Sequence, residues 1–138
     1  MISLRTKQPV RIEDHLDGRV VVPKRALVDA FPALPACERG EGEQSFRVLF
    51  KDLDLNRHVN HVVYIQWALE TAPPEVLKAK RPVEIEVAYK AEAFYGDTVL
   101  SRLQAETPVG AGGGPAFLHG IFKKDGGAEL TRLRTRWD

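Results

Sequence analysis

Apolar and polar residues alternate along several segments of the chain, and this period of two predicts β-strands. In residues 45–50, Phe46, Val48 and Phe50 fall on one face and Arg47 on the other, as in a half-buried strand. In residues 83–89, Val83, Ile85 and Val87 alternate with Glu84 and Glu86 in the same way. Three further segments are also expected to be strands: residues 97–106, 116–124 and 129–137. Glycine-containing turns connect the last three segments, so we expect all four to form an antiparallel meander.

Residues 59–72 are apolar on almost every side of a helix, which predicts a buried helix. Asn60 can cap its start, and Pro73 and Pro74 end it. One long helix with a strand before it and four strands after it predicts an α+β domain. The arrangement resembles a single hot-dog fold, in which an antiparallel β-sheet wraps around a central buried helix.

The first 44 residues differ in character from the rest. The basic, mildly apolar residues 4–12 are expected to form an extended arm or edge strand, and residues 24–31 a short helix after a proline. A charged, glycine-containing linker follows. We therefore divide the chain into two parts: an N-terminal arm and linker, residues 1–44, and a hot-dog domain, residues 45–138.

Composition restricts the class of protein. The 138 residues include 20 Lys and Arg and 19 Asp and Glu, which gives a net charge of +1. This balance argues against a nucleic-acid partner and against a polybasic membrane surface. No apolar run reaches the ~20 residues that span a bilayer, and the N-terminus has no apolar signal region. We therefore expect a cytoplasmic protein.

Cys37 is the only cysteine in the sequence. This excludes an intramolecular disulfide and argues against a thiolate metal cluster. One histidine with neighbouring Asp and Asn residues, and no further ligand at suitable spacing, is a weak metal site. We expect neither a metal nor a cofactor.

The densest group of polar residues, residues 51–60, lies between a predicted strand and the buried helix. Asp54, Asn56 and His58 are spaced by two, so in an extended or turn segment their side chains can point the same way. Loops held by rigid elements often carry functional groups, and a helix N-terminus favours a developing oxyanion. The plainer interpretation is that Asp and Asn cap the turn and that His58 is structural. Their combination in one turn favours a functional site.

Two blocks of the sequence resemble a known family. Residues 50–70, FKDLDLNRHVNHVVYIQWALE, are similar to the signature of the acyl-ACP thioesterases, a family of double hot-dog enzymes. Residues 83–97, VEIEVAYKAEAFYGD, are similar to the family's second block and place Tyr89 and Glu92 at matching positions. The resemblance implies four catalytic residues: Asp54, Asn56, His58 and Glu92. Three substrate-binding residues are also expected: Asn60, Tyr64 and Trp67.

The chain departs from the family pattern in three ways. Ala93 stands where many members have cysteine, so a cysteine nucleophile is absent from this position. His61 replaces the second asparagine of the pair that follows His-Val in the family. The resemblance covers only the second of the family's two hot-dog domains.

Thioester hydrolysis needs a positioned water or nucleophile and donors for the carbonyl oxygen. Asp54 or Glu92 can take the proton from water, or Asp54 can attack directly and form an anhydride. Asn56 and His58 can orient the carboxylate or donate to the oxyanion. The sequence leaves both routes open.

The resemblance implies an acyl thioesterase that releases a fatty acid from acyl carrier protein or coenzyme A. Two alternatives remain: a small-molecule acyl-CoA thioesterase of the 4-hydroxybenzoyl-CoA type, and a non-catalytic acyl-binding hot-dog domain. Because a single hot-dog sheet leaves an open edge, we expect a homodimer.

Overall fold

The computed structural model describes residues 32–38, 40–107 and 113–138, together with isolated positions before residue 32. The chain divides into two compact units, residues 1–31 and residues 32–138. The expected N-terminal arm, residues 4–12, and short helix, residues 24–31, lie mostly outside the described residues. The helices and strands below all belong to the second unit.

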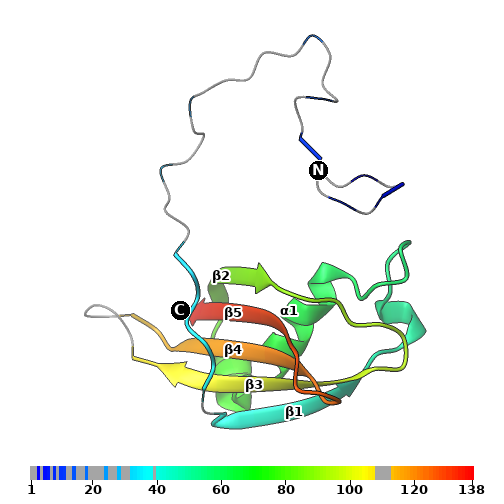
Figure 1. Ribbon diagram of the computed structural model, residues 1–138. Helices are drawn as coiled ribbons and strands as arrows, with labels where there is room; N and C mark the ends of the chain where they lie inside the picture. The colour runs from blue at the N-terminus through cyan, green and yellow to red at the C-terminus, as the bar shows by residue number, and fades with distance from the viewer. Residues whose placement is uncertain are drawn as a thin grey trace. The chain divides into compact units, whose positions relative to one another are not determined.

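Five strands form one antiparallel sheet in the order β1-β3-β4-β5-β2 (Figure 1). The strands are β1 (Gly42–Arg47), β2 (Pro82–Tyr89), β3 (Thr98–Glu106), β4 (Ala116–Lys123) and β5 (Glu129–Trp137). Strand β1 begins three residues earlier than expected. The predicted four-strand meander is wrong in one respect, because β2 pairs with β5 and not with β3. Residues 90–97 are not a tight turn; they carry the chain along one end of the sheet to β3 (Figure 1).

Helix α1 (His61–Glu70) packs against β3, β4 and β5. Its start is fixed as expected, since the Asn60 side chain accepts a hydrogen bond of 3.0 Å from the backbone N–H of Val62. A 3₁₀ turn, η2 (Phe50–Asp52), precedes α1, and a short helix, α2 (Pro74–Ala79), follows it. The helix on the antiparallel sheet confirms the hot-dog fold. No helix in the described part of the chain is long and apolar enough to cross a bilayer.

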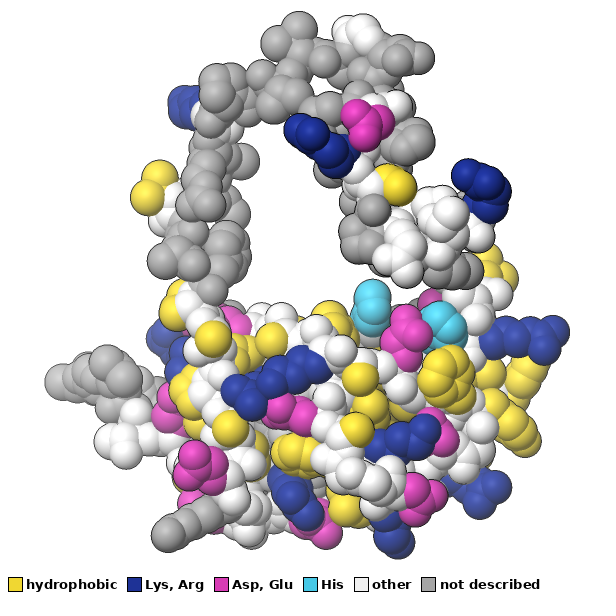
Figure 2. All heavy atoms as spheres, in the orientation of Figure 1, with side chains coloured by type: hydrophobic (Ala, Val, Ile, Leu, Met, Phe, Trp, Pro, Cys, Tyr) yellow, Lys and Arg dark blue, Asp and Glu magenta, His cyan; other side chains and the backbone are white. Residues whose placement is uncertain are grey.

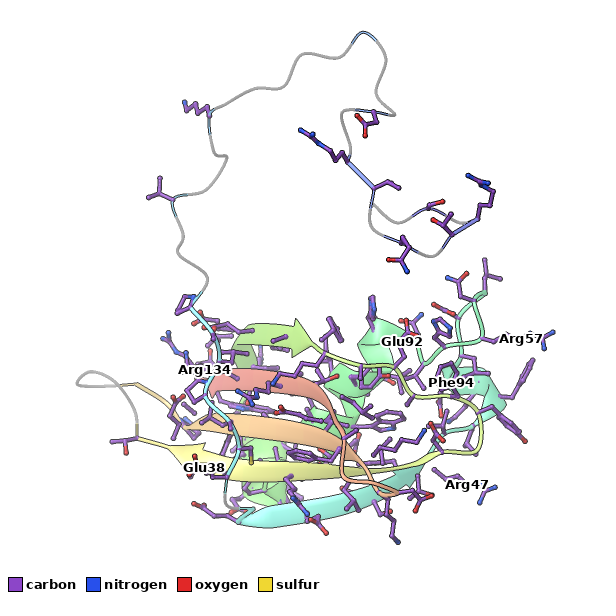
Figure 3. All side chains as sticks on the ribbon, in the orientation of Figure 1. Glu38, Arg47, Arg57, Glu92, Phe94 and Arg134 are labelled. Carbon is purple, nitrogen blue, oxygen red and sulfur yellow. The ribbon has the colours of Figure 1, made fainter. Side chains whose placement is uncertain are left out.

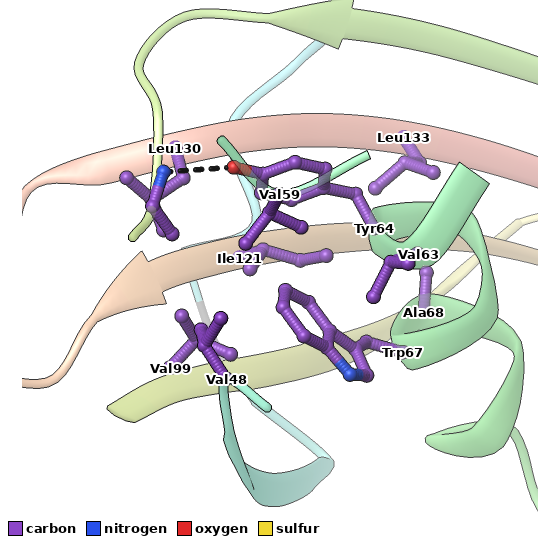
Figure 4. Close-up of a cluster of buried hydrophobic side chains, with 11 residues drawn as sticks. Val48, Val59, Val63, Tyr64, Trp67, Ala68, Val99, Ile121, Leu130 and Leu133 are labelled. Atoms are coloured by element: carbon purple, nitrogen blue, oxygen red, sulfur yellow. Dashed lines mark hydrogen bonds between the residues drawn. The ribbon is translucent and has the colours of Figure 1, made fainter. Parts of the chain in front are cut away.

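The main core lies between α1 and the sheet (Figure 4). Four side chains of α1 are buried there: Val63, Tyr64, Trp67 and Ala68. The expectation of a helix buried on all sides is wrong, because Val62 is 55% exposed and Ile65 and Leu69 are only partly buried. A single sheet covers only one side of a helix, so the other side of α1 stays open.

The opposite face of the sheet is partly covered by residues 32–38. The Leu34 carbonyl accepts a hydrogen bond of 2.9 Å from Arg132 on β5. Cys37 is buried beside Gly120 of β4. A Cβ atom added to Gly120 would lie 3.2 Å from the Cβ of Cys37. These contacts attach residues 32–38 to the sheet, and the boundary at residue 45 stays a prediction.

Polar side chains are buried on the helix-facing side of β4 and β5. His119 Nε2 and Thr135 Oγ1 lie 2.9 Å apart, and Trp137 Nε1 donates to the same oxygen at 3.0 Å. The other ring nitrogen, His119 Nδ1, has no partner among the described residues. Burial lowers the pKa of His119 from 6.5 to about 4. The imidazole is therefore neutral in the folded protein at neutral pH.

Acidification is expected to destabilise the domain through His119. Below pH 6.5 the unfolded chain binds a proton that the native imidazole does not bind until about pH 4. The neutral imidazole therefore contributes about 3 kcal/mol to the free energy of unfolding above pH 6.5. This contribution is lost as the pH falls towards 4. Urea unfolding at pH 7 and pH 4.5 measures this loss. The free energy of unfolding of a His119→Leu variant should change less between these two pH values. An equal change in both proteins would contradict the role of His119.

Candidate active site

A tight turn after η2 positions the predicted catalytic residues. Asp54 Oδ1 accepts hydrogen bonds from the backbone N–H groups of Asn56, at 2.8 Å, and His58, at 3.2 Å. The backbone N–H of Asp54 in turn donates to the His58 carbonyl at 2.8 Å. Arg57, at the tip, has a left-handed backbone with φ 63°; such strain in a non-glycine residue persists only where surrounding contacts fix the turn. Asp54 therefore holds His58 in a defined place.

The segment after β2 lies directly beside this turn. The backbone N–H of Val59 donates to the Ala93 carbonyl at 3.0 Å, and His58 forms an isolated β-bridge with Phe94. On the other side, the backbone N–H of Ala93 donates to the Tyr64 hydroxyl at 2.9 Å (Figure 4). Ala93 is fully buried between these two contacts. Its neighbour Glu92 is thereby placed next to the turn (Figure 3).

His58 and Glu92 form the central contact of the site. His58 Nδ1 lies 3.0 Å from Glu92 Oε1, with side chains that are 36% and 60% exposed. The ring of Phe94 meets the imidazole edge-on at 5.2 Å between centroids, which restricts its rotation. The other ring nitrogen of His58, Nε2, has no hydrogen bond to the described residues. This nitrogen is available to a water or a substrate.

All four predicted catalytic residues line one hollow of about 540 Å³. They are Asp54, Asn56, His58 and Glu92. Tyr64 also lines the hollow, although it is only 2% exposed. Burial is the main cause of the raised pKa of Tyr64; the hydrogen bond from Ala93 opposes it and the charge of Glu92 adds to it. The Tyr64 hydroxyl is therefore a neutral, fixed part of the wall.

The remaining predicted residues lie elsewhere. Asn60 caps α1 and lines a second, neighbouring hollow of about 740 Å³. Trp67 lies in the core, 6% exposed and stacked on Phe46 with ring centroids 5.8 Å apart. It does not line the described hollows, so the structure gives it a packing role, and its contact with substrate stays a prediction.

His61 and Tyr89 also line the first hollow, although no role was predicted for either residue. His61 is the first residue of α1, and Tyr89 is the last residue of β2. Their positions in the sequence could have indicated them. His61 directly follows the turn that carries His58, and Tyr89 directly precedes the segment that carries Glu92. Among the described residues, no three His, Cys, Asp or Glu side chains are grouped to hold a metal ion.

Comparison with known proteins gives the same family as the sequence blocks. A family model for the acyl-ACP thioesterase C-terminal domain matches residues 37–138. The chain is 41% identical over 147 residues to an acyl-[acyl-carrier-protein] hydrolase from Cuphea viscosissima, covering 99% of this chain and 34% of that protein. It is 33% identical over 135 residues to a palmitoyl-acyl carrier protein thioesterase from Cuphea hookeriana, covering 96% of this chain and 32% of the relative.

Solved structures agree on the fold. An acyl-ACP thioesterase from Bacteroides thetaiotaomicron superposes with a TM-score of 0.67 at 22% identity, covering 99% of this chain and 53% of the other. The chain spans about a third of the length of the two Cuphea relatives. From the matched domain and these relatives, we conclude that the chain belongs to the acyl-ACP thioesterase family and corresponds to its C-terminal domain.

Proposed function

We propose that this chain hydrolyses a fatty acyl thioester, carried by acyl carrier protein or coenzyme A, to a free fatty acid and a thiol. The single observation that carries the proposal is the contact of 3.0 Å between His58 Nδ1 and Glu92 Oε1 at the edge of a hollow. The names of the two Cuphea relatives, a hydrolase and a thioesterase of acyl carrier protein substrates, support the same chemistry.

The contact favours His58 as the general base. When the proton is on Nδ1, the Glu92 carboxylate accepts it in a hydrogen bond and leaves Nε2 free to take a proton from water. A carboxylate in this place also stabilises the imidazolium that forms. The activated water then attacks the carbonyl carbon of a thioester in the hollow. Glu92 thus orients His58, a role that the sequence analysis did not consider.

Asp54 and Asn56 support this reaction in different ways. One oxygen of Asp54 already accepts two backbone N–H groups, which favours a role in positioning His58 over direct attack on the substrate. The Asn56 side chain lines the hollow and can donate its amide N–H to the developing oxyanion. The N-terminus of α1 adds a favourable dipole at the same end of the site.

The test of this function is steady-state hydrolysis of acyl-CoA and acyl-ACP substrates over a range of chain lengths. Turnover that depends on His58 supports the proposal, and the preferred carrier distinguishes acyl-ACP from acyl-CoA hydrolysis. Binding of acyl thioesters without any turnover would contradict it and would favour a non-catalytic acyl-binding domain. The cytoplasmic location expected from the sequence stays a prediction, since both Cuphea relatives are chloroplastic.

We further propose that the chain forms a homodimer through β2. This strand lies at the end of the sheet and pairs only with β5, so its other edge has unpaired backbone groups. Two apolar side chains of β2, Val83 and Ile85, are exposed, as is Val62 of α1. A second copy that meets this edge across a two-fold axis would extend the sheet and cover these side chains.

Sedimentation equilibrium at micromolar concentration is expected to give a mass near twice 15.4 kDa. Ile85→Lys, at the exposed edge, should shift the mass towards one copy because a charge there opposes edge pairing. Circular dichroism serves as the control that the variant keeps its fold. A wild-type mass near 15.4 kDa under these conditions would refute the dimer.

A further inference from the structure

A second imidazole is fixed in the wall of the catalytic hollow. The ring of His61 stacks on the ring of Tyr89, with centroids 4.4 Å apart and planes inclined by 29°. The Tyr89 hydroxyl donates a hydrogen bond of 3.0 Å to the His61 carbonyl, which ties the end of β2 to the start of α1. Both residues line the same hollow as His58 and Glu92. Tyr89 thus contacts both the ring and the backbone of His61 at the site.

A chain of packed groups connects this wall to the wall that carries Glu92. The ring of Tyr89 meets Tyr64 edge-on, with centroids 5.9 Å apart. The Tyr64 hydroxyl accepts the hydrogen bond from Ala93, the residue next to Glu92. Figure 2 shows two histidine side chains at the surface with an acidic side chain between them.

The two imidazoles differ in their partners. His58 is paired with Glu92, whereas no carboxylate of the described residues forms an ion pair with His61. An imidazole exchanges protons readily near neutral pH. Thioester hydrolysis requires two proton transfers, one from the attacking water and one to the departing sulfur. His58 is suited to the first transfer, and the hollow holds His61 as a separate group for the second.

We propose that His61 is the general acid that protonates the departing thiol; this inference rests on the proposed thioesterase function. The water oxygen bonds to the carbonyl carbon and gives one proton to His58 Nε2. The C–S bond then breaks with its electron pair on sulfur, and the His61 imidazolium gives sulfur its proton. The carboxylic acid product and His58 lose their protons to solvent, and His61 takes one proton from solvent, which restores the starting state. Tyr89 is a positioning residue for His61.

The test compares two thioesters with different leaving groups. An acyl-CoA releases an alkylthiolate, a strong base that needs protonation, whereas a thiophenyl ester releases a weaker base that departs unaided. His61→Phe keeps an aromatic ring against Tyr89 but has no proton to give. For this variant we expect kcat with acyl-CoA to fall about 10²-fold, and kcat with the thiophenyl ester to stay within about threefold of the wild-type value. His61→Asn introduces the asparagine that the family pattern has at this position, and it should show the same selective loss of activity with acyl-CoA.

Two further measurements separate proton donation from packing. Tyr89→Phe removes the hydrogen bond to the His61 carbonyl, so we expect a smaller loss that is again confined to acyl-CoA. The pH profile of wild-type kcat with acyl-CoA should fall on the alkaline side, and this limb should be absent in His61→Phe. The charged or titratable groups that face His61 in the hollow are Asp54, His58, Tyr64, Tyr89, Lys90 and Glu92. Their contributions to the profile remain in both proteins, so the difference reports on His61.

The outcomes distinguish this inference from the function on which it rests. An equal loss with both esters, or full activity of His61→Phe with acyl-CoA, overturns the role of His61 while the thioesterase function stands. A wild-type chain that hydrolyses neither ester overturns both. Thermal unfolding of each variant checks that the fold is retained, and the ratio of the two activities is independent of the amount of folded protein.

Discussion

Glu92→Gln is expected to reduce kcat for acyl thioester hydrolysis by about 10²–10⁴-fold. The carboxylate lies 3.0 Å from His58 Nδ1, and in the proposed mechanism it holds the tautomer in which Nε2 can accept a proton. An amide has no charge to stabilise the imidazolium and can present its NH₂ group to Nδ1, which would favour the wrong tautomer. Because Glu92 is 60% exposed, the substitution should leave the fold intact. Steady-state kinetics with acyl-CoA measures the loss.

A double-mutant comparison shows whether the two residues act as a unit. His58→Gln alone should cost about as much as Glu92→Gln, and the double variant should be little worse than either, since groups in one proton-transfer pair are not additive. Cys37→Ser is the matched control, because Cys37 is buried beside Gly120 of β4 and is not among the residues that line the hollow. Independent, multiplicative losses would contradict the paired mechanism.

Trp67→Ala is expected to destabilise the domain by ~3–5 kcal/mol. The indole is 6% exposed and lies between Phe46 of β1 and Tyr64 of α1, with ring centroids 5.8 Å and 5.4 Å away. Its removal leaves a cavity where the helix meets the sheet, and the two neighbouring rings lose their partner. Urea unfolding followed by circular dichroism measures the change in the free energy of unfolding.

Gln66→Ala is the control on the same helix. Gln66 precedes Trp67 but is exposed, so its truncation should change the free energy of unfolding by less than ~0.5 kcal/mol. A small effect of Trp67→Ala, comparable with that of Gln66→Ala, would show that the indole is not a central packing residue.

The sequence predicted the start of α1 and the turn of residues 54–58 because both depend on neighbouring residues. Asn60 caps the helix through the backbone of Val62, two residues away, and Asp54 fixes its own turn through residues 56 and 58. Both are local contacts that follow from residue type and spacing. The placement of Glu92 in the site came from the family resemblance, since an isolated strand carboxylate has no local signal.

Three features depend on contacts far along the chain and were not predicted. The pairing of β2 with β5 depends on which strands share a core, which alternation alone does not show. The exposed side of α1 follows from the single sheet that covers it, whereas the apolar sequence suggested burial all round. The contact of His58 with Glu92 requires the path of residues 90–97, which only the assembled sheet defines.

The pairing of β2 with the final strand has a consequence for synthesis of the protein. Lys90 and Ala91, just before Glu92, are both hydrogen-bonded through their backbone N–H groups to the carbonyl of Leu130 in β5. The hydrogen bond between Tyr64 and Ala93, 29 residues apart, holds the same segment from the side of α1 and does not involve β5. A nascent chain that has left the ribosome only as far as β4 already contains every proposed catalytic residue and the contacts of Val59 and Tyr64 with Ala93, but Lys90 and Ala91 still lack their partner in β5. The last nine residues of sheet, Glu129–Trp137, therefore add the second support of the segment that carries Glu92.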